Sequence, residues 1–367
     1  MQKIIVFDSD HPGALENWCF REEAASQGLS FTVELAKQAV SKGFEIMTGD
    51  VLLKKTIAPE TRIFCISEMH SQRTNAILKE GAIPVVCICM ESPIIARDFY
   101  LNINKYAGRF LHCIQFKGTA MRLNKSATEF SIMYFPVYSR TPLPAVPWPK
   151  RKRLVLINRN KRAFYTDRTT LKGAIRSVLA RVKFSLQKWR DPWMRSPEIY
   201  KDRIEAIYYF STHDTFELYG AGWENRIVGF PLKYHRAALK ALKGTIGNED
   251  KLIVMSQFKF AICFENCSFS GYVTEKIFDC FLAGCIPIYY GAPDIEEFVP
   301  AGTFIDYRKF KNMKDLDRYL SNLGETEAHS MIEKARKFLS STDFDKYYLQ
   351  NFTSGVIEKI EKWAGKG

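Results

Sequence analysis

The chain has 367 residues, of which 46% are hydrophobic, and its formal net charge is +13. This length exceeds one ordinary core and predicts two domains, while the lack of any run of ~18 apolar residues excludes a typical membrane span. The nine cysteines fall mostly within apolar patterns, so we expect buried thiols in a cytoplasmic, reducing compartment.

The first ~135 residues alternate strand and helix patterns, which is typical of a parallel sheet. Strands are predicted at 3–7, 44–48, 62–66, 84–89 and 109–116, with helices at 30–42 and 75–80. Five prolines between 136 and 149 then exclude a helix or a central strand. We expect the interdomain linker there, after a first domain of residues 1–140.

The second half repeats this pattern from a strand at 153–157 onward. A basic, largely helical stretch at 162–193 interrupts it as an insertion, followed by a helix at 197–210 and a strand at 215–219. Helices are expected again at 313–323, 328–339 and 344–363. We therefore predict a second domain over 150–345 and a C-terminal helix over 346–367.

Residues 260–293 carry the most specific pattern of the chain. An apolar strand, 261–264, ends at Glu265-Asn266, a loop with Gly271 and Tyr272 follows, and Thr274-Glu275-Lys276 opens a helix closed by Ala283-Gly284. A second strand covers 285–290. Ligands of parallel sheets lie beyond the strand ends against helix N-termini, whose free N–H groups favour anions. Lys276 adds a cation, which we expect to be mobile.

Within this unit, FxxCFEN, GYVTEKIFD and AGCIPIYYGAP resemble the donor-binding signature of the α1,3-fucosyltransferases. The match involves about ten residue types in fixed order over roughly thirty positions, with weaker similarity from about 87 to 307. Any one of these residues alone is more often an ordinary turn former, helix-surface charge or packing aromatic. Their joint spacing is what favours the resemblance.

The resemblance implies an α/β protein of GT-B architecture, with two Rossmann-like domains facing across a cleft. It implies acceptor binding by the first domain, GDP-L-fucose binding by the second, and inverting transfer of L-fucose to N-acetylglucosamine or glucose in an oligosaccharide, through an α1,3 or α1,4 linkage. Glu275 would contact the fucose ring, and Asn266 and Tyr272 the nucleotide. The expected partners are GDP-fucose and an oligosaccharide or glycolipid acceptor, with peripheral contact at the inner face of a membrane.

Inverting transfer needs a base for the acceptor proton and positive charge for the departing diphosphate. Glu91 follows an apolar strand, and the next turn is restricted by Pro93, so a cleft-facing carboxylate is expected there; Glu91 also resembles the family's catalytic glutamate. For the diphosphate, Lys276 is joined by an arginine, and the choice between Arg203 and Arg162 stays open.

Other functions are compatible with parts of the sequence. Asp8-Ser9-Asp10 has the Asp-x-Asp spacing of a metal site but lies far from the donor signature, so no divalent metal is expected to be required. A GT-B transferase for another nucleotide sugar is the first alternative. The second is a basic nucleic-acid-binding protein, indicated by the arginines and aromatics of 150–195, although nothing resembles a known nucleic-acid module. The acceptor-binding loops carry no recognisable signature.

Overall fold

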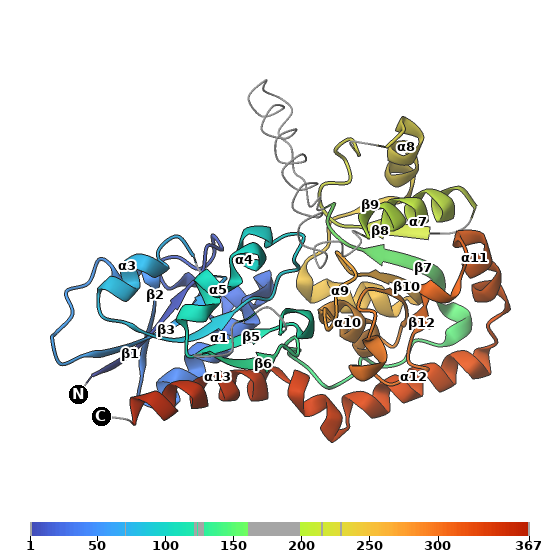
Figure 1. Cartoon of the computed structure of the whole chain (residues 1–367). Helices are drawn as coiled ribbons and strands as arrows, with labels where there is room; N and C mark the ends of the chain where they lie inside the picture. Colours follow the sequence, from blue (N-terminus) through green and yellow to red (C-terminus); the bar gives the residue numbers. More distant parts are fainter. Residues whose placement is uncertain are drawn as a thin grey trace.

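The computed structural model describes residues 2–69, 71–120, 123, 128–160, 199–213, 216–227 and 230–365. The predicted insertion at 162–193, including Arg162, lies outside the described residues. Two six-stranded sheets stand side by side, each flanked by helices (Figure 1). Every strand pairing in both sheets is parallel.

The first sheet has the strand order β2-β1-β3-β4-β5-β6. Its strands are β1 (Lys3–Asp8), β2 (Glu45–Thr48), β3 (Arg62–Glu68), β4 (Ile83–Ile88), β5 (His112–Gln115) and β6 (Glu129–Ile132). Its helices are α1 (Ser30–Ser41), α2 (Gly49–Leu52), α3 (Thr74–Lys79), α4 (Arg97–Leu101) and α5 (Ile103–Tyr106). The near-continuous apolar strands fit a parallel sheet that is covered on both faces.

The second sheet has the order β12-β11-β10-β7-β8-β9. Its strands are β7 (Lys152–Ile157), β8 (Phe216–Tyr219), β9 (Leu242–Gly244), β10 (Phe258–Phe264), β11 (Ile286–Tyr290) and β12 (Ile305–Asp306). Its helices are α7 (Tyr200–His213), α8 (Leu232–Ala241), α9 (Asn248–Ser256), α10 (Glu275–Ala283), α11 (Met313–Asn322) and α12 (Glu325–Leu339). The sequence patterns did not predict α8, β9 or α9.

Each sheet contains a switch point, where the strand order reverses and neighbouring loops leave in opposite directions. In the first sheet it lies between β1 and β3, and in the second between β7 and β10. Ligands of open parallel sheets bind beyond the carboxyl ends of the strands at such points. The loop after β10 is the one that carries the fucosyltransferase-like pattern, so the fold places that pattern at the second switch point.

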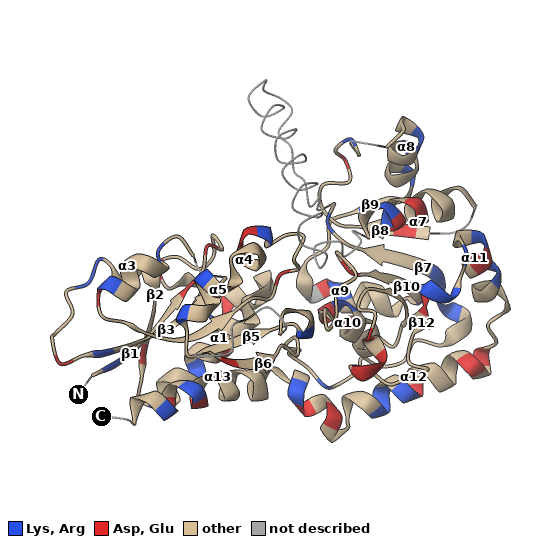
Figure 2. Cartoon of the chain, viewed as in Figure 1, with Lys and Arg blue, Asp and Glu red and all other residues tan. Residues whose placement is uncertain are grey.

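The C-terminal helix α13 (Leu349–Ala364) returns to the first half of the chain (Figure 1). Val356, Ile357 and Ile360 join the core cluster of the first sheet. The carbonyls of Trp363 and Ala364 accept hydrogen bonds from Arg62 at 2.9 and 3.1 Å. The first turn of α12 is acidic and its last turn is basic, and both kinds of charge also occur on α13 (Figure 2). The end of the chain therefore ties the two halves together.

The proline-rich segment is held at two points along its length. The N–H of Val137 donates to the carbonyl of Tyr347 at 2.7 Å, just before α13, and the N–H of Leu143 donates to the carbonyl of Leu282 at 2.7 Å, in α10.

No helix among the described residues has the length and apolar character needed to cross a membrane. All nine cysteines are buried free thiols.

Candidate active site

Glu265 is the first residue beyond β10, and its side chain is fully buried. Its N–H donates to the carbonyl of Tyr290 at 2.8 Å, which extends the pairing of β10 with β11 by one residue. The carboxylate accepts the N–H of Thr274 at 2.9 Å and the Thr274 hydroxyl at 2.9 Å. Since Thr274 is the N-cap of α10, Glu265 joins the end of the strand to the start of the helix.

Lys276 forms an ion pair with this carboxylate, with Nζ 2.7 Å from Glu265 Oε2 and 2.8 Å from Thr274 Oγ1. The expectation of a mobile cation is therefore wrong, because the buried carboxylate holds the ammonium in place. Burial opposes the charged form, but the neighbouring carboxylates of Glu265 and Glu275 raise the pKa of Lys276. The lysine thus remains a fixed positive charge at the edge of the sheet.

Sequence reasoning missed the role of Glu265, which it treated only as a strand end. The signal was available in the sequence, since an acidic residue that is buried at the end of a wholly apolar strand needs a cation or hydrogen-bond donors as partners. A lysine eleven residues later, in the first turn of the next helix, is a natural partner when that helix starts beside the strand end.

Glu275, the first residue of α10, is more accessible, with a side chain 40% exposed and Oε1 3.9 Å from Lys276 Nζ. Burial acts to raise the pKa of Glu275, but the charges of Lys276 and Lys251 outweigh it, and the pKa is lowered. A carboxylate in the first helical turn is also favoured by the helix dipole. Glu275 is therefore an ionised, reachable carboxylate beside a fixed cation.

Arg203 extends from α7 to the same strand end and is 1% exposed. Its Nη2 donates to the carbonyls of Phe264 and Glu265, both at 2.9 Å. The arginine charge acts to lower the pKa of Lys276, which places the two cations near each other. Arg203 thus lies within the site predicted for it, where it orders the main chain at the end of β10.

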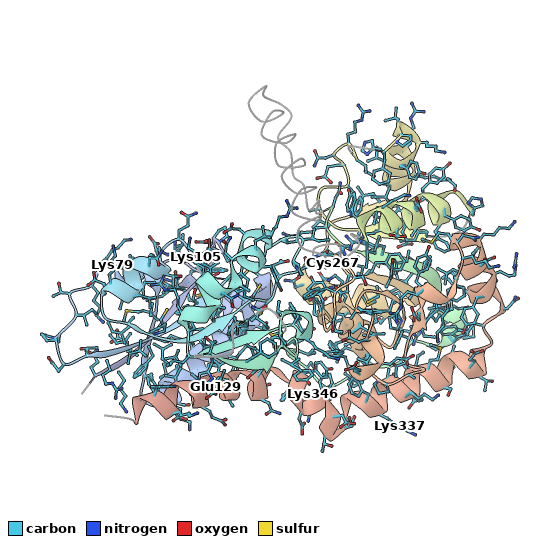
Figure 3. The ribbon with its side chains drawn as sticks, viewed as in Figure 1. Lys79, Lys105, Glu129, Cys267, Lys337 and Lys346 are labelled. Carbon is cyan, nitrogen blue, oxygen red and sulfur yellow. The ribbon has the colours of Figure 1, made fainter. Side chains whose placement is uncertain are left out.

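The loop after Glu265 reaches across to the first half of the chain. Cys267, Phe269 and Tyr272 all belong to the core cluster of the first sheet, and Cys267 is marked at the junction of the two halves in Figure 3. Gly271 has a φ of 72°, and a Cβ there would lie 2.8 Å from the Cβ of Lys117. This close approach explains why a glycine occupies the position.

Tyr272 is only 2% exposed, and its ring packs edge-to-face on Phe116 with centroids 4.9 Å apart. The half-buried Asn266 donates from Nδ2 to the Tyr272 hydroxyl at 3.4 Å. In this structure Tyr272 is thus an interdomain packing residue. Contact of Asn266 and Tyr272 with a nucleotide stays a prediction.

Glu91 comes from the first half, three residues beyond β4, and is half-buried. Its carbonyl accepts the Tyr100 hydroxyl at 2.9 Å, which fixes the loop. Burial raises the pKa of Tyr272, and the charges of Glu265, Glu91 and Glu275 raise it further. The charge of Glu91, from the first half of the chain, therefore acts on Tyr272 in the loop after β10, together with those of Glu265 and Glu275.

The Asp-x-Asp pattern at the end of β1 has a structural use. Asp8 is fully buried and accepts the Thr74 hydroxyl at 2.7 Å and the Arg73 Nε–H at 3.3 Å. The hydroxyl of Ser9 donates to Glu68 Oε2 at 2.5 Å. Within the described residues, no group of three or more His, Cys, Asp or Glu side chains is arranged to hold a metal ion.

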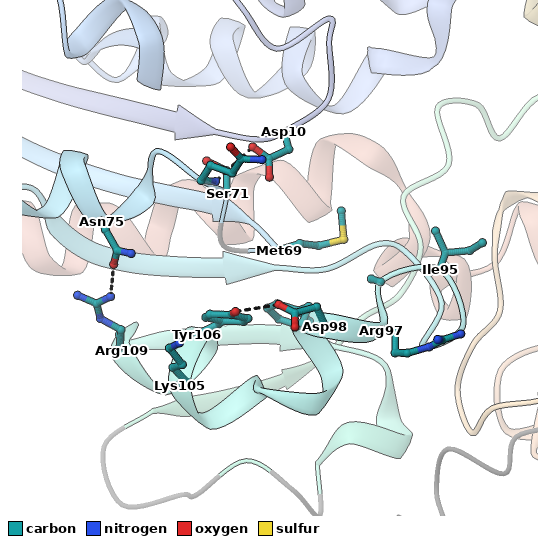
Figure 4. Close-up of a pocket in the computed structure, with 13 residues that line it drawn as sticks. Asp10, Met69, Ser71, Asn75, Ile95, Arg97, Asp98, Lys105, Tyr106 and Arg109 are labelled. Atoms are coloured by element: carbon teal, nitrogen blue, oxygen red, sulfur yellow. Dashed lines mark hydrogen bonds between the residues drawn. The ribbon is translucent and has the colours of Figure 1, made fainter. Parts of the chain in front are cut away.

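A pocket of roughly 500 Å³ opens at the switch point of the first sheet (Figure 4). Asp10, Met69 and Ser71, beyond β1 and β3, form one side of it. The segment Ile95–Phe99, which follows the Glu91 loop, and residues of α5 complete it. Sequence reasoning missed this pocket, because its residues come from four separate segments of the chain and share no motif.

Comparisons with known proteins agree with this geometry. Residues 195–332 match the family described as "Glycosyltransferase family 10 (fucosyltransferase) C-term". An Arabidopsis thaliana alpha-(1,4)-fucosyltransferase is 42% identical over 116 residues, which cover 30% of this chain and 29% of that protein. The alpha-(1,3)-fucosyltransferase FucT of Helicobacter pylori is 32% identical over 116 residues, covering 31% of this chain and 24% of that protein. The matched part is thus less than a third of each relative.

Among solved structures, Anabaena HepE in complex with UDP and glucose is similar over 99% of this chain and 100% of its own, with a TM-score of 0.55 and 12% identity. That likeness concerns the fold and confirms the predicted α/β class with GT-B architecture. The region that carries the sequence match contains α7, β10 and α10, which supply Arg203, Glu265 and Lys276. Residues 195–332 are therefore similar to the C-terminal region of the glycosyltransferase family 10 fucosyltransferases.

Proposed function

We propose that the chain is an inverting fucosyltransferase that moves L-fucose from GDP-L-fucose to a hydroxyl of N-acetylglucosamine or glucose in an oligosaccharide. The observation that carries the proposal is the strand–loop–helix unit of the family domain, which fixes Lys276 at the second switch point. Support also comes from Glu91, a carboxylate of the first half of the chain whose charge acts on Tyr272 in the same loop.

The donor site would be the region around the N-terminus of α10. Lys276 is held 2.7 Å from Glu265, and Arg203 lies against the same strand end, so two cations share one edge of the sheet. Together with the free N–H groups of the helix they favour a diphosphate without a divalent metal. Glu275 is accessible enough to contact the fucose ring, and Asn266 and Tyr272 would border the nucleotide.

The reaction is a single displacement at C1 of fucose. The acceptor oxygen forms the new bond to C1 as the bond from C1 to the phosphate oxygen breaks, and GDP leaves with the bonding electrons. Glu91 accepts the proton of the acceptor hydroxyl, because neutralising the new oxonium requires a base at that point. The Glu275 carboxylate stabilises the positive charge that develops on the sugar ring.

The relatives support either linkage, since one is named as an α1,4 and one as an α1,3 enzyme. We propose that the protein works in the cytoplasm, in peripheral contact with the inner face of a membrane. The nine buried thiols fit a reducing compartment, and the net charge of +13 favours an anionic surface. A glycolipid or lipid-linked oligosaccharide would then be within reach as acceptor.

Nucleotide release with a panel of GDP-fucose, GDP-mannose, UDP-glucose and UDP-N-acetylglucosamine tests the proposal. We expect acceptor-dependent GDP release from GDP-fucose alone, unchanged by EDTA. Nucleotide release from a UDP-sugar only would contradict the proposal and favour the alternative, a transferase for another nucleotide sugar. The observation that motivates this alternative is the similar fold of HepE, which was solved with UDP and glucose. Salt-sensitive RNA binding without release from any donor would instead favour the nucleic-acid-binding alternative.

A further inference from the structure

The pocket at the first switch point has sides of opposite charge. Asp10 lies on one side in Figure 4, and Lys105 and Arg109 lie on the other. Arg97 and Asp98 also line the pocket, and Asp98 lies beside Tyr106 in Figure 4. The lining thus contains three cations and two carboxylates, with Lys105 and Arg109 opposite Asp10.

The two cations are oriented by neutral groups. Lys105 Nζ lies 5.5 Å from the ring centroid of Tyr106, and that ring stacks on Phe99 with centroids 6.3 Å apart. The guanidinium of Arg109 donates to Asn75 Oδ1, an amide oxygen, as the dashed line in Figure 4 shows. Lys105 lies in α5, and Arg109, four residues later, lies in the 3-10 turn that follows. One short segment therefore supplies both cations to the pocket wall.

The cations also keep their charge available. In the part of the chain that the structure describes, neither Lys105 nor Arg109 forms an ion pair, although both are exposed. Asp98 also lines the pocket, but its oxygens accept the Tyr106 hydroxyl at 2.8 Å and the Asn102 amide at 3.1 Å. Two positioned positive charges at the wall of a pocket of ligand size are therefore suited to an anion.

We propose that this pocket binds the acceptor glycan and that Lys105 and Arg109 hold an anionic group on it, a carboxylate or a phosphate. The inference rests on the proposed function, since it gives the acceptor of that reaction its chemical class. The acceptor lies with its anionic group at Lys105 and Arg109, away from Asp10, and the proposed function requires its reacting hydroxyl to reach Glu91. A neutral glycan has no charge to pair with Lys105 and Arg109, so these residues do not increase its affinity.

Binding measurements test the charge preference without depending on catalysis. Glucose, glucuronate and glucose 6-phosphate are titrated into the protein at 50 mM and 300 mM NaCl by ligand-observed NMR. We expect at least one of the two anions to bind about tenfold more tightly than glucose at low salt, and the difference to shrink at high salt. Whichever anion binds more tightly distinguishes a carboxylate from a phosphate. Equal affinity of all three sugars would overturn the proposal.

Variants locate the effect in the pocket. Lys105→Ala and Arg109→Ala should each weaken binding of the preferred anion about tenfold and leave glucose unchanged, whereas Lys105→Arg keeps the preference. Lys79→Ala is the matched control, because Lys79 is an exposed lysine of α3 outside the pocket lining (Figure 3). Equal loss in the control, or no loss in either pocket variant, would contradict the assignment.

The same variants separate this inference from the proposed function. With GDP-fucose and matched oligosaccharides, Lys105→Ala should raise KM for the anionic acceptor about tenfold with little change in kcat. Transfer to a neutral acceptor with no preference for the anionic one would overturn the anion site and leave the fucosyltransferase standing. Anion binding that depends on Lys105 and Arg109, with no transfer to any acceptor, would overturn the fucosyltransferase alone.

Discussion

The two switch points of this molecule handle charge in opposite ways. At the second, Glu265 is fully buried and Lys276 is 18% exposed, and they neutralise each other at 2.7 Å. At the first, Glu91 is half-buried and Lys105 and Arg109 are exposed, with neutral groups as their neighbours. A buried pair fixes geometry, whereas exposed charges remain available to a ligand. Under the proposed function, the second edge is built in advance for the common donor, and the first is open to a particular acceptor.

Replacement of Glu91 by glutamine should show the largest effect, because the first edge would lose its base while the second stays intact. We expect transfer to fall about 10³-fold. Calorimetric titration with GDP should give an unchanged affinity. Glu80→Gln, an exposed glutamate after α3, serves as the control and should retain full activity. Full activity in Glu91→Gln would remove Glu91 from the mechanism.

Lys276→Ala tests whether the second edge depends on its buried pair. The substitution leaves the fully buried Glu265 carboxylate without its cation, so we expect a loss of about 3 kcal/mol in the free energy of unfolding and weaker GDP binding. Urea unfolding measures the first effect and calorimetry the second.

The double variant Lys276→Ala/Glu265→Gln provides the control for that experiment. It removes both charges, so it should recover part of the stability but none of the GDP affinity. Additive losses from the two substitutions would show that the residues do not act as a pair.

Gly271→Ala probes the contact between the loop after β10 and the first half of the chain. The new Cβ would lie 2.8 Å from the Cβ of Lys117, so the loop must shift. Gly81→Ala is a matched control, since Gly81 also has a positive φ, 85°, but nothing lies within 4 Å of its Cβ position. We expect about 1 kcal/mol of destabilisation from the control and 1–3 kcal/mol more from Gly271→Ala, measured by urea unfolding. Equal losses would show that only backbone strain matters there.

The smallest effect should appear in the dependence of stability on alkaline pH. The pKa of Lys276 and that of Lys251 are raised in the fold, since neighbouring carboxylates outweigh burial. The two ion pairs contribute fully to the free energy of unfolding below a pH of about 10.4, the pKa of lysine in the unfolded chain. This contribution is lost as the pH rises through the higher pKa of the folded state. Unfolding free energies at pH 9 and 11 should therefore differ less in Glu265→Gln/Lys276→Met than in the unsubstituted protein. An equal difference would contradict the coupling.

The strand–loop–helix unit around 260–293 was predictable from the sequence because its determinants are local. Apolar residues gave the strands, and Gly284, with a φ of 64°, ends α10 where the pattern predicted. Glu91 and Lys276 were named from their places after a strand and at the start of a helix, whereas Glu275 and Arg203 were named from the resemblance. In contrast, α8 was missed although its sequence is amphipathic. The α9 helix was missed because its apolar residues form one short run, 252–255, without a helical period.

The sequence by itself determined two parallel α/β halves and the place of the donor-binding pattern. Hydrophobic periodicity and the order of elements depend only on residues that are close in the chain. Only the tertiary structure decided that Glu265 holds Lys276, that Tyr272 is buried against Phe116, and that α13 packs on the first half. It alone also brought Asp10, Lys105 and Arg109 around one pocket. These contacts join residues distant in the chain, and burial and charge pairing at such distances depend on how the two sheets meet.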